Sequence, residues 1–499
     1  MTLPPGFDPS SINLADVVQA LDWESGVPDS RAVRRDPRMP SLSRSAGFLA
    51  SIAAGWGEAD RRLAVEPGAA QAAEQHRARL SAQLPGETIV VAAGRAHVRA
   101  NDNFFEFRAA SDFIWLVGCG FDDAVLVMRP IAGGHDAVLY ITPPARPGDD
   151  AFFRDSIHGE LWVGGLAGIA ETEAALGISV EDIRDLQVPD DALIAGSPVV
   201  AKAAGSVIGG RKRSGGLARE LSELRQIKDA WEIAQLRAAV DATIAGFAAT
   251  AREIPRAVEH GGERWLQGTF DRHARTFGQA PGYSTIVGAG AHAPILHWVR
   301  ADGAIGLEDA LLLDMGIEAR SGYTADVTRT VPASGTFNAA QRQVHDLVEA
   351  SHRAGLAAVA PGRPWVDFHA ACMEVLAAGL ADWGLLPVSV DEALSPDGQQ
   401  HRRYIVCGVG HHLGLDVHDC ASSRYETYLG GTLQPGMALT VEPGLYFHAF
   451  DETVPPELRG IGVRIEDDLV VTDTGTEVLS AALPIDAAGL EQWTRAAQA

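Results

Sequence analysis

The sequence predicts a mixed α/β (α+β) protein of two domains, on three observations. Its 499 residues exceed the size of one typical hydrophobic core, so two or three domains are expected. Short strand-like runs follow a helical stretch between residues 69 and 143. The second half alternates long helical segments with apolar strands. We therefore expect an N-terminal α/β domain over residues 1–215 and a C-terminal domain over residues 216–499.

The predicted N-terminal domain begins with about 85 residues that we expect to form a helical extension. This part is rich in alanine and arginine, and "AAQAAEQHRARLSAQL" is typical of a helix. Residues 204–216, "AGSVIGGRKRSGG", are rich in glycine and basic residues and predict a hinge. Between these segments, four short apolar runs predict strands. They are "ETIVVAAG", "FIWLVGC", "AVLVMRP" and "AVLYITP".

One long helix is expected over residues 218–254, because its apolar residues recur at roughly helical spacing and form one stripe. A second helix is expected over residues 339–359. Apolar strand runs at 310–319, 437–447 and 462–473 complete the predicted C-terminal domain.

Composition and charge restrict the partners and the compartment. Hydrophobic residues make up 46% and charged residues 21% of the chain, as in an ordinary soluble protein. The net charge of -24 repels phosphate backbones, so nucleic acid is not an expected partner. No apolar run approaches the ~20 residues of a membrane span, so no membrane partner is expected. The four cysteines show no C-x-x-C spacing and fit a reducing compartment.

A short apolar run after Arg34 and Arg35 superficially resembles an export signal. It begins more than thirty residues into the chain, contains prolines and lacks an A-x-A cleavage site. Cytoplasmic localisation is therefore expected.

Four acidic residues interrupt or end apolar strand-like runs, where a charge must be paired or bound to a metal. They are Asp314 in "LLLDMG", Asp326 in "YTADVTRT", Glu442 in "LTVEPGLY" and Glu466 in "GVRIEDD". Each one alone could be a solvent-facing residue at a strand end. Taken together, they would repel one another unless cations neutralised them. Arg464 lies two residues before Glu466 and therefore shares its face of the strand.

The stretch "GHHLGLDVHD", residues 410–419, holds three histidines and two aspartates. If it were extended, His411 and His418 would face opposite sides. A helix would align them, but the glycines of the stretch disfavour a regular helix. We therefore expect the chain to turn here, and the stretch alone does not decide which side chains take part in chemistry.

The motifs follow one another in the order "LLLDMG…ADVTRT", "GHHLGLDVHD", "LQPGMALTVEPGLYF" and "RGIGVRIEDD". This set resembles the pita-bread metallopeptidases, most of all the Xaa-Pro aminopeptidases (aminopeptidase P) and the related prolidases. The resemblance runs from about Arg219 to the C-terminus, and "VRANDNFFEFRAASDFIWLVGC" resembles the N-terminal domain of these enzymes. It implies a C-terminal pita-bread domain, in which a curved, mostly antiparallel sheet is covered by helices.

The resemblance implies a catalytic centre with two divalent metal ions. Asp326 and Glu466 would bridge the two ions. Asp314 would complete the shell of one ion, and His411 with Glu442 the shell of the other. Mostly oxygen ligands with one imidazole favour Mn²⁺ first, with Co²⁺, Fe²⁺ or Zn²⁺ as alternatives.

The same resemblance implies further roles around the metals. His418, and His297 in "PILHW", would hold the scissile carbonyl or stabilise the tetrahedral intermediate. Arg464 would support a ligand carboxylate, and Tyr283 would lie beside the metals. The expected catalytic residues are therefore His297, His418, Glu442 and Arg464.

The implied reaction is hydrolysis of the bond between an N-terminal residue and a following proline. Two metal ions about 3.5–4 Å apart lower the pKa of a shared water, and the resulting hydroxide would attack the peptide carbonyl. Glu442 is the expected proton shuttle. Peptides with proline at the second position are the expected partners, and a homodimer or homotetramer is expected because the family commonly forms them. His412 and Asp419 receive no role and are expected to be structural.

Two alternatives remain open on the sequence. A prolidase would need a cation for the carboxylate of its dipeptide substrate, and Arg300, Arg402 or Arg403 could supply it from a loop. A pita-bread protein without catalysis would only bind a ligand or partner. Two positions depart from the family pattern: Cys407 stands where a histidine is common, and His292 where asparagine is more usual.

Overall fold

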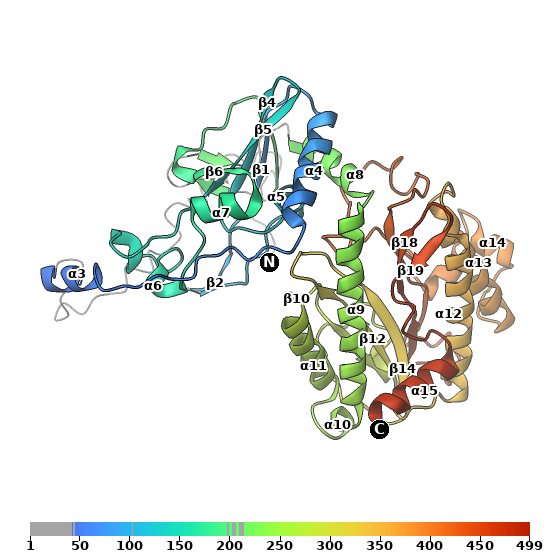
Figure 1. Ribbon diagram of the computed structural model, residues 1–499. Coiled ribbons are helices and arrows are strands. Elements are labelled where there is room, and N and C mark those ends of the chain that lie inside the picture. Colours follow the sequence, from blue (N-terminus) through green and yellow to red (C-terminus); the bar gives the residue numbers. More distant parts are fainter. Residues whose placement is uncertain (1–41, 43–44, 102, 197–198, 202–205, 209–213) are drawn as a thin grey trace, which may run out of the picture.

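The computed structural model of the chain describes residues 42, 45–101, 103–196, 199–201, 206–208 and 214–499. These residues form two lobes (Figure 1). The N-terminal lobe comprises the described residues up to 208, with helix α8 (Ser214–Arg225) packed against it, and the C-terminal lobe comprises residues 230–499. The sequence around Arg34 and Arg35 and most of the predicted hinge lie outside the described residues. The boundary predicted after residue 215 adjoins them and stays a prediction.

The N-terminal lobe is built on a five-stranded sheet with the order β6-β5-β4-β1-β7. The sheet is mixed, because β1 pairs antiparallel with β4 but parallel with β7, and β5 pairs parallel with β6. The predicted α/β class is thereby confirmed. The strands are β1 (Ile89–Ala92), β4 (Val125–Ile131), β5 (Gly134–Ile141), β6 (Ser179–Asp182) and β7 (Leu193–Gly196), with short pairs β2 (Val98–Ala100) and β3 (Asn103–Phe104), β8 (Val199–Ala201) and β9 (Ser206–Ile208). The helices are α3 (Ala46–Ile52), α4 (Ala69–Gln83), α5 (Ser111–Val117), α6 (Glu160–Val163) and α7 (Ile169–Leu176).

One predicted strand of this lobe, "FIWLVGC", is wrong, because the run forms helix α5. Residues 113–117 are all buried, and a short run that is apolar on every side does not distinguish a buried strand from a buried helix. Gly118 ends the helix in the left-handed conformation, with φ 94°. The other three predicted strands are confirmed as β1, β4 and β5.

The single helix predicted over residues 218–254 is also wrong, because the chain breaks between α8 and α9. Asp229 caps α9: its carboxylate accepts from the Glu232 N–H at 2.9 Å, and the Glu232 carboxylate accepts from the Asp229 N–H at 2.9 Å. The Lys228 N–H donates to the Gly436 carbonyl at 2.8 Å instead of continuing a helix. The second predicted helix is confirmed as α12. Helix α8 packs against β7, α4 and α5 of the N-terminal lobe. The helices of the C-terminal lobe are α9 (Ala230–Arg252), α10 (Ile254–Glu259), α11 (Gly262–Phe277), α12 (Ala339–Ala358), α13 (Val366–Asp382), α14 (Val390–Leu394) and α15 (Ala487–Gln498).

The C-terminal lobe contains antiparallel sheets between layers of helices, which confirms the predicted arrangement. Figure 1 shows the strands between α9 and α11 on one side and α12 and α13 on the other. The sheets are β11-β12-β14, β15-β18-β19 and the pairs β16-β17 and β10-β13. An isolated bridge between Thr328 and Glu466 links the first sheet to the segment that joins β17 and β18. The strands are β10 (Ala280–Pro281), β11 (Ile286–Ala289), β12 (Ala310–Met315), β13 (Ile317–Glu318), β14 (Val327–Pro332), β15 (Ala438–Val441), β16 (Gly444–Phe447), β17 (Ile461–Arg464), β18 (Asp467–Val471) and β19 (Thr476–Val478).

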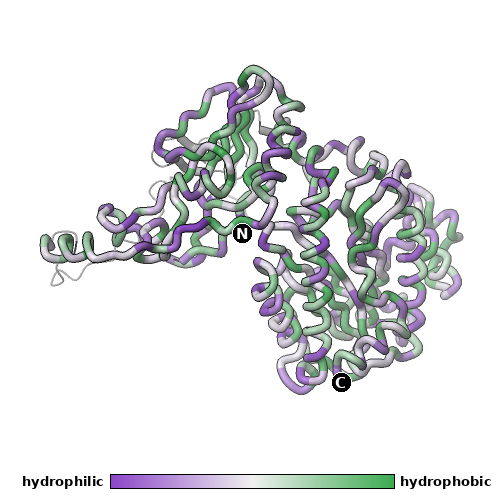
Figure 2. The backbone as a smooth tube through the Cα atoms, viewed as in Figure 1, coloured by the Kyte–Doolittle hydropathy of each residue, from purple (hydrophilic) through white to green (hydrophobic). Residues whose placement is uncertain are grey.

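The hydrophobic core runs along these sheets. Figure 2 shows hydrophobic residues concentrated along the strands at the centre of each lobe. All six residues of β12 are buried, Asp314 included, so this strand carries a carboxylate into the interior. No helix in the described part of the chain is long and apolar enough to cross a membrane.

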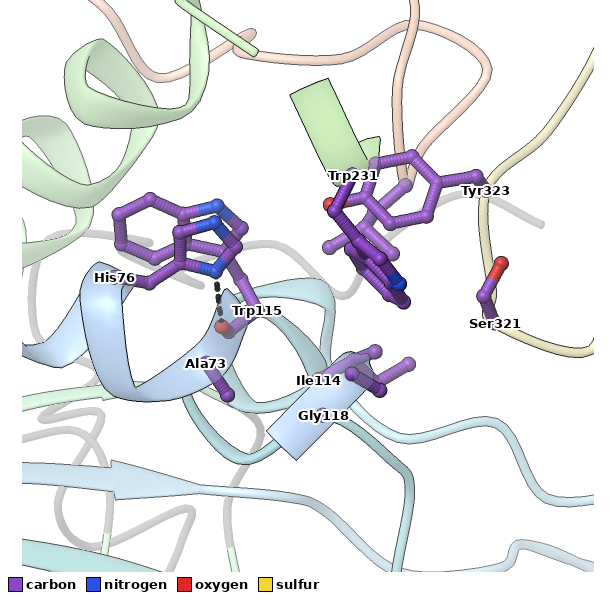
Figure 3. Close-up of a pocket in the computed structure, with 10 residues that line it drawn as sticks. Ala73, His76, Ile114, Trp115, Gly118, Trp231, Ser321 and Tyr323 are labelled. Carbon is purple, nitrogen blue, oxygen red and sulfur yellow. Dashed lines mark hydrogen bonds between the residues drawn. The ribbon is translucent and has the colours of Figure 1, made fainter. Parts of the chain in front are cut away.

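The two lobes meet at a buried polar cluster, beside the pocket drawn in Figure 3. His76 of α4 stacks on Trp115 of α5 with ring centroids 4.3 Å apart, and its Nδ1–H donates to the Trp115 carbonyl at 2.7 Å. His76 Nε2 lies 3.0 Å from Asp229 Oδ2 at the start of α9. Glu232 accepts from the Tyr323 hydroxyl at 2.7 Å. Burial would lower the pKa of His76, but the two carboxylates raise it to about 9, so a buried imidazolium joins the lobes.

Candidate metal centre

Asp314 and Asp326 are brought together by the antiparallel pairing of β12 with β14. Asp314 lies in β12 opposite Thr328, and Asp326 immediately precedes β14. The connecting turn comes very close to β12 at Gly316, where an added Cβ would lie 1.8 Å from the Ala325 carbonyl oxygen. Only glycine fits this approach, and the approach keeps the two aspartates on the same side of the sheet.

Glu442 and Glu466 enter the same space from two other strands. Glu442 directly follows β15, and Glu466 lies in the short connection between β17 and β18. The Glu466 N–H donates to the Thr328 carbonyl at 3.1 Å, and the Thr328 hydroxyl donates to Glu466 Oε2 at 2.7 Å. Both the main chain and the side chain of Glu466 are therefore held against β14.

His411 is held next to β15 by the main chain. Its N–H donates to Thr440 Oγ1 at 3.2 Å, and its carbonyl accepts from the Thr440 N–H at 2.9 Å. Its Nδ1–H donates to the His412 carbonyl at 3.1 Å, which leaves Nε2 pointing to the carboxylates. His411 Nε2 lies 3.4 Å from Asp326 Oδ2 and 3.5 Å from Glu442 Oε1.

The ligand atoms of these side chains fall into overlapping groups, each within 4.8 Å. Asp314, Asp326 and Glu466 form one group, and His411, Glu442 and Glu466 form a second. A third group joins Asp326 and His411 to His418. Carboxylate oxygens with one imidazole suit divalent cations, and two groups that share Glu466 fit two neighbouring ions. If Asp326 and Glu466 bridge two ions, each of them must belong to two ligand groups. Their bridging roles stay predictions.

The electrostatics of the centre reflect three buried acids and the partly buried Glu442 facing one histidine. Burial raises the pKa of Glu442 to about 7, although the neighbouring His411 opposes the shift. Burial and the three neighbouring carboxylates raise the pKa of Glu466 well above its usual range, and burial also raises that of Asp314. Burial would lower the pKa of His411, but Asp326 and Glu442 raise it to about 9. Without cations, the centre therefore retains protons that a metal would displace.

Arg464 and Tyr283 hold Asp314 from both sides. The buried guanidinium of Arg464 forms an ion pair with Asp314 Oδ2, and the Tyr283 hydroxyl donates to Asp314 Oδ1 at 2.6 Å. Arg464 Nε donates to Thr328 Oγ1 at 3.0 Å, so it supports Glu466 through that hydroxyl as well. Arg464 Nη1 donates to the Tyr446 hydroxyl at 3.0 Å.

Thr328 and Tyr446 are two contacts that the sequence reasoning missed. Both lie inside the quoted motifs, and Thr328 shares a strand face with Asp326 because the two are two residues apart. That spacing could have identified Thr328.

The two remaining expected catalytic histidines lie on the exposed side of the centre. The ring of His418 meets the ring of His411 edge-on, with centroids 4.3 Å apart. Burial and the charge of His411 lower the pKa of His418, and His297 is near enough to contribute to this shift. His418 and His297 are both exposed, so both can reach a substrate.

His412 and Asp419 have partners elsewhere. His412 is buried against the Trp365 ring, with centroids 4.5 Å apart, and Asp419 pairs with Arg225 and Lys228. These contacts fit the expected structural role. Cys407 lies beside Glu442 and Arg464, and burial raises the pKa of its thiol. His292 Nδ1 lies 2.8 Å from Glu263 Oε1, away from the five ligands.

Both the N-terminal and the C-terminal part of the chain are similar to known proteins. Residues 234–473 match the model of metallopeptidase family M24, and residues 73–198 match that of the aminopeptidase P N-terminal domain. An Xaa-Pro aminopeptidase 2 of Streptomyces coelicolor is 46% identical over 468 residues, which cover 92% of this chain and 98% of that protein. The Xaa-Pro aminopeptidase of Escherichia coli (strain K12) is 32% identical, over 80% of this chain and 91% of that protein. The low-pH structure of E. coli aminopeptidase P matches with a TM-score of 0.74 at 28% identity, over 86% of this chain and 99% of that one.

Proposed function

This chain belongs to the M24 metallopeptidases and, within them, to the Xaa-Pro aminopeptidases, and we propose that it removes the first residue of peptides whose second residue is proline. The observation that carries this proposal is the pair of overlapping ligand groups that share Glu466. When bound there, two divalent ions would lower the pKa of a water and polarise the scissile carbonyl. We propose that Asp314, Asp326, His411, Glu442 and Glu466 hold them.

The proposed roles of the residues that act with the metals follow from their positions. Glu442, at the end of β15 beside His411, would transfer the proton of the attacking water. His418 and His297, on the exposed side, would donate to the developing oxyanion of the substrate carbonyl. Arg464 orients Asp314 through their ion pair, and its charge opposes the rise in the pKa of Asp314 that burial causes.

Substrate length separates this proposal from the prolidase alternative, which the relatives do not favour. A dipeptide has a free carboxylate that needs a cation, and the three arginines considered for it are engaged elsewhere. Arg402 donates to three main-chain carbonyls, those of residues 405–407. Arg403 pairs with Asp451 at 2.8 Å, and the Arg300 guanidinium lies 4.1 Å from the centroid of a tryptophan ring. A peptide chain that continues past proline needs no such cation.

We further propose Mn²⁺ as the native metal, with Co²⁺, Fe²⁺ or Zn²⁺ as alternatives, because oxygen ligands predominate. A homodimer or homotetramer and a cytoplasmic location are also proposed. Light scattering at micromolar concentration tests the first of these, and a monomer would contradict it.

The deciding experiment is a peptide series with metal-free and Mn²⁺-loaded protein. Xaa-Pro-Yaa tripeptides should be cleaved after the first residue with a higher kcat/KM than Xaa-Pro dipeptides, and matched Xaa-Ala-Yaa peptides should be poor substrates. Strict preference for dipeptides would make the protein a prolidase. Metal analysis separates catalysis from mere binding, since a binding-only protein should not carry a stoichiometric pair of ions.

A further inference from the structure

His418 lies on a short loop, and one buried arginine contacts an aspartate on each side of it. Arg225, at the end of α8, places Nη2 3.1 Å from Asp416 Oδ2 and forms an ion pair with Asp419 Oδ1. Asp416 lies two residues before His418, and Asp419 directly follows it. The Arg225 and Asp419 side chains are only 6% and 1% exposed, so this pair is shielded from water, whereas the Asp416 side chain is 46% exposed.

The same guanidinium reaches the N-terminal lobe. Arg225 Nη1 donates to Asp112 Oδ1 at 2.7 Å, and Asp112 lies in the first turn of α5. Beside it, the Ser111 hydroxyl donates to Asp416 Oδ1 at 2.5 Å. The loop that carries His418 is therefore tied to α5 both directly and through Arg225.

The loop conformation needs this support. Cys420 has φ 60°, in the left-handed region that residues with a side chain rarely adopt. Such a conformation persists only where the surroundings hold it. Here Asp419 is held by Arg225 and by Lys228 Nζ at 3.0 Å, and the carboxylate and the ammonium are each 1% exposed.

Packing does less to fix His418 itself, because the imidazole is exposed beside an open polar pocket of about 360 Å³. The pocket lies between α5, α8 and the loop after His418, and residues of both lobes line it. With space on one side, the position of the ring depends on the main chain that carries it. That main chain is set by the contacts of Arg225.

We propose that Arg225 is a positioning residue for His418 and that it couples the docking of the N-terminal lobe to catalysis. This inference rests on the proposed catalytic role of His418. It gives the N-terminal lobe a part in the reaction although that lobe contributes none of the five metal ligands.

The test is a double-mutant cycle in the metal-loaded full chain. Arg225→Lys keeps the charge, but one nitrogen cannot reach both Asp112 and Asp419 as a guanidinium does. It should lower kcat by about 10-fold, since misplacing a catalytic group by about 1 Å can cost up to 10²-fold. KM and the metal content should change by less than about twofold. In the His418→Ala background, Arg225→Lys should lower kcat by less than about twofold, because the group that it positions is gone.

Two further variants keep the test decisive. Asp112→Asn leaves the Arg225–Asp419 pair intact, and it should lower kcat by about threefold, again only when His418 is present. Arg237→Lys is the matched control, because Arg237 pairs with Glu477 at 2.8 Å on the exposed surface of α9. It should leave kcat unchanged.

The outcomes separate the inference from the proposed function. If His418→Ala lowers kcat but Arg225→Lys is equally harmful with and without His418, the coupling is wrong while the catalytic role of His418 stands. If His418→Ala leaves kcat unchanged, that role is wrong and the inference falls with it. Should Arg225→Lys fail to fold, Asp112→Asn decides by the same comparison.

Discussion

Loading the metal-free protein with Mn²⁺ should release protons, because the empty centre holds protons where a cation would bind. Metal ligands must be deprotonated, so every proton retained on a ligand is displaced on binding. His411, with a pKa of about 9, and Glu442, with a pKa of about 7, retain protons near neutral pH. The number released therefore follows from the structure.

At pH 7, a pKa of about 9 leaves His411 almost fully protonated and a pKa of about 7 leaves Glu442 half protonated, so the two release about 1.5 protons. Glu466 and Asp314, whose pKa values burial also raises, can only add to this number. Protons compete with the cations, so the overall binding constant for the two ions should rise with pH, by at least about 30-fold per unit near pH 7.

Isothermal titration calorimetry in buffers of different ionisation enthalpy counts the protons. His411→Gln should reduce the count by about half a proton to one proton, because loss of the His411 charge also raises the pKa of Glu442. His76→Gln is the matched control, since His76 also has a pKa of about 9 but lies between the lobes, away from the five ligands. It should leave the count unchanged. A release near zero, or equal effects of the two substitutions, would refute the reasoning.

Three other predictions test single residues. Asp326→Asn should abolish metal binding and activity together while circular dichroism stays native, because Asp326 belongs to two of the ligand groups; activity above about a tenth of the original would contradict this. His411→Ala should lower the metal content, whereas His418→Ala should keep it and lower kcat by about 10²–10³-fold, and loss of metal from the second variant would mean that the roles are exchanged. Raising the pH should loosen the N-terminal lobe: the raised pKa of His76 stabilises the folded state fully below about 6.5, and this stabilisation is lost as the pH rises through about 9. Hydrogen exchange in α4 should therefore accelerate above pH 9, and His76→Gln should remove this pH dependence of the exchange. If the variant kept the same pH profile, His76 would not be its cause.

The carboxylates expected to bind metal could be picked out of the sequence because each one interrupts or ends an apolar strand-like run. An isolated charge in such a run is too costly to bury unpaired, so acids like Asp314 and Glu466 stand out. The histidines could not be separated in this way. His411 and His418 would diverge on an extended strand, yet their rings lie 4.3 Å apart because the chain turns between them. The sequence predicted the turn, but only the resemblance implied which histidine binds metal.

The errors in the fold arose where tertiary contacts override local pattern. The break between α8 and α9 follows no loss of helical spacing. It forms where the Lys228 main chain bonds to Gly436 and its side chain pairs with Asp419, both about 200 residues away. Helix α5 was mistaken for a strand because a run that is apolar on every side carries no period.

The polar residues that hold the expected metal ligands follow a regular spacing, and this spacing explains why some of them could be predicted from the sequence. Each of two neighbouring strands is flanked by one expected ligand that lies two residues from a polar support in the strand: Asp326 precedes β14, which holds Thr328, and Glu466 follows β17, which ends at Arg464. Residues at this spacing share a strand face, so ligand and support enter the site together. The Thr328 hydroxyl then joins the strands, since it accepts from Arg464 and donates to Glu466. The two-residue spacing from Glu466 identified Arg464 as a support, and the same spacing from Asp326 could have identified Thr328. The pairings across strands, Arg464 with Asp314 and Thr328 with Glu466, cannot be read from one strand alone.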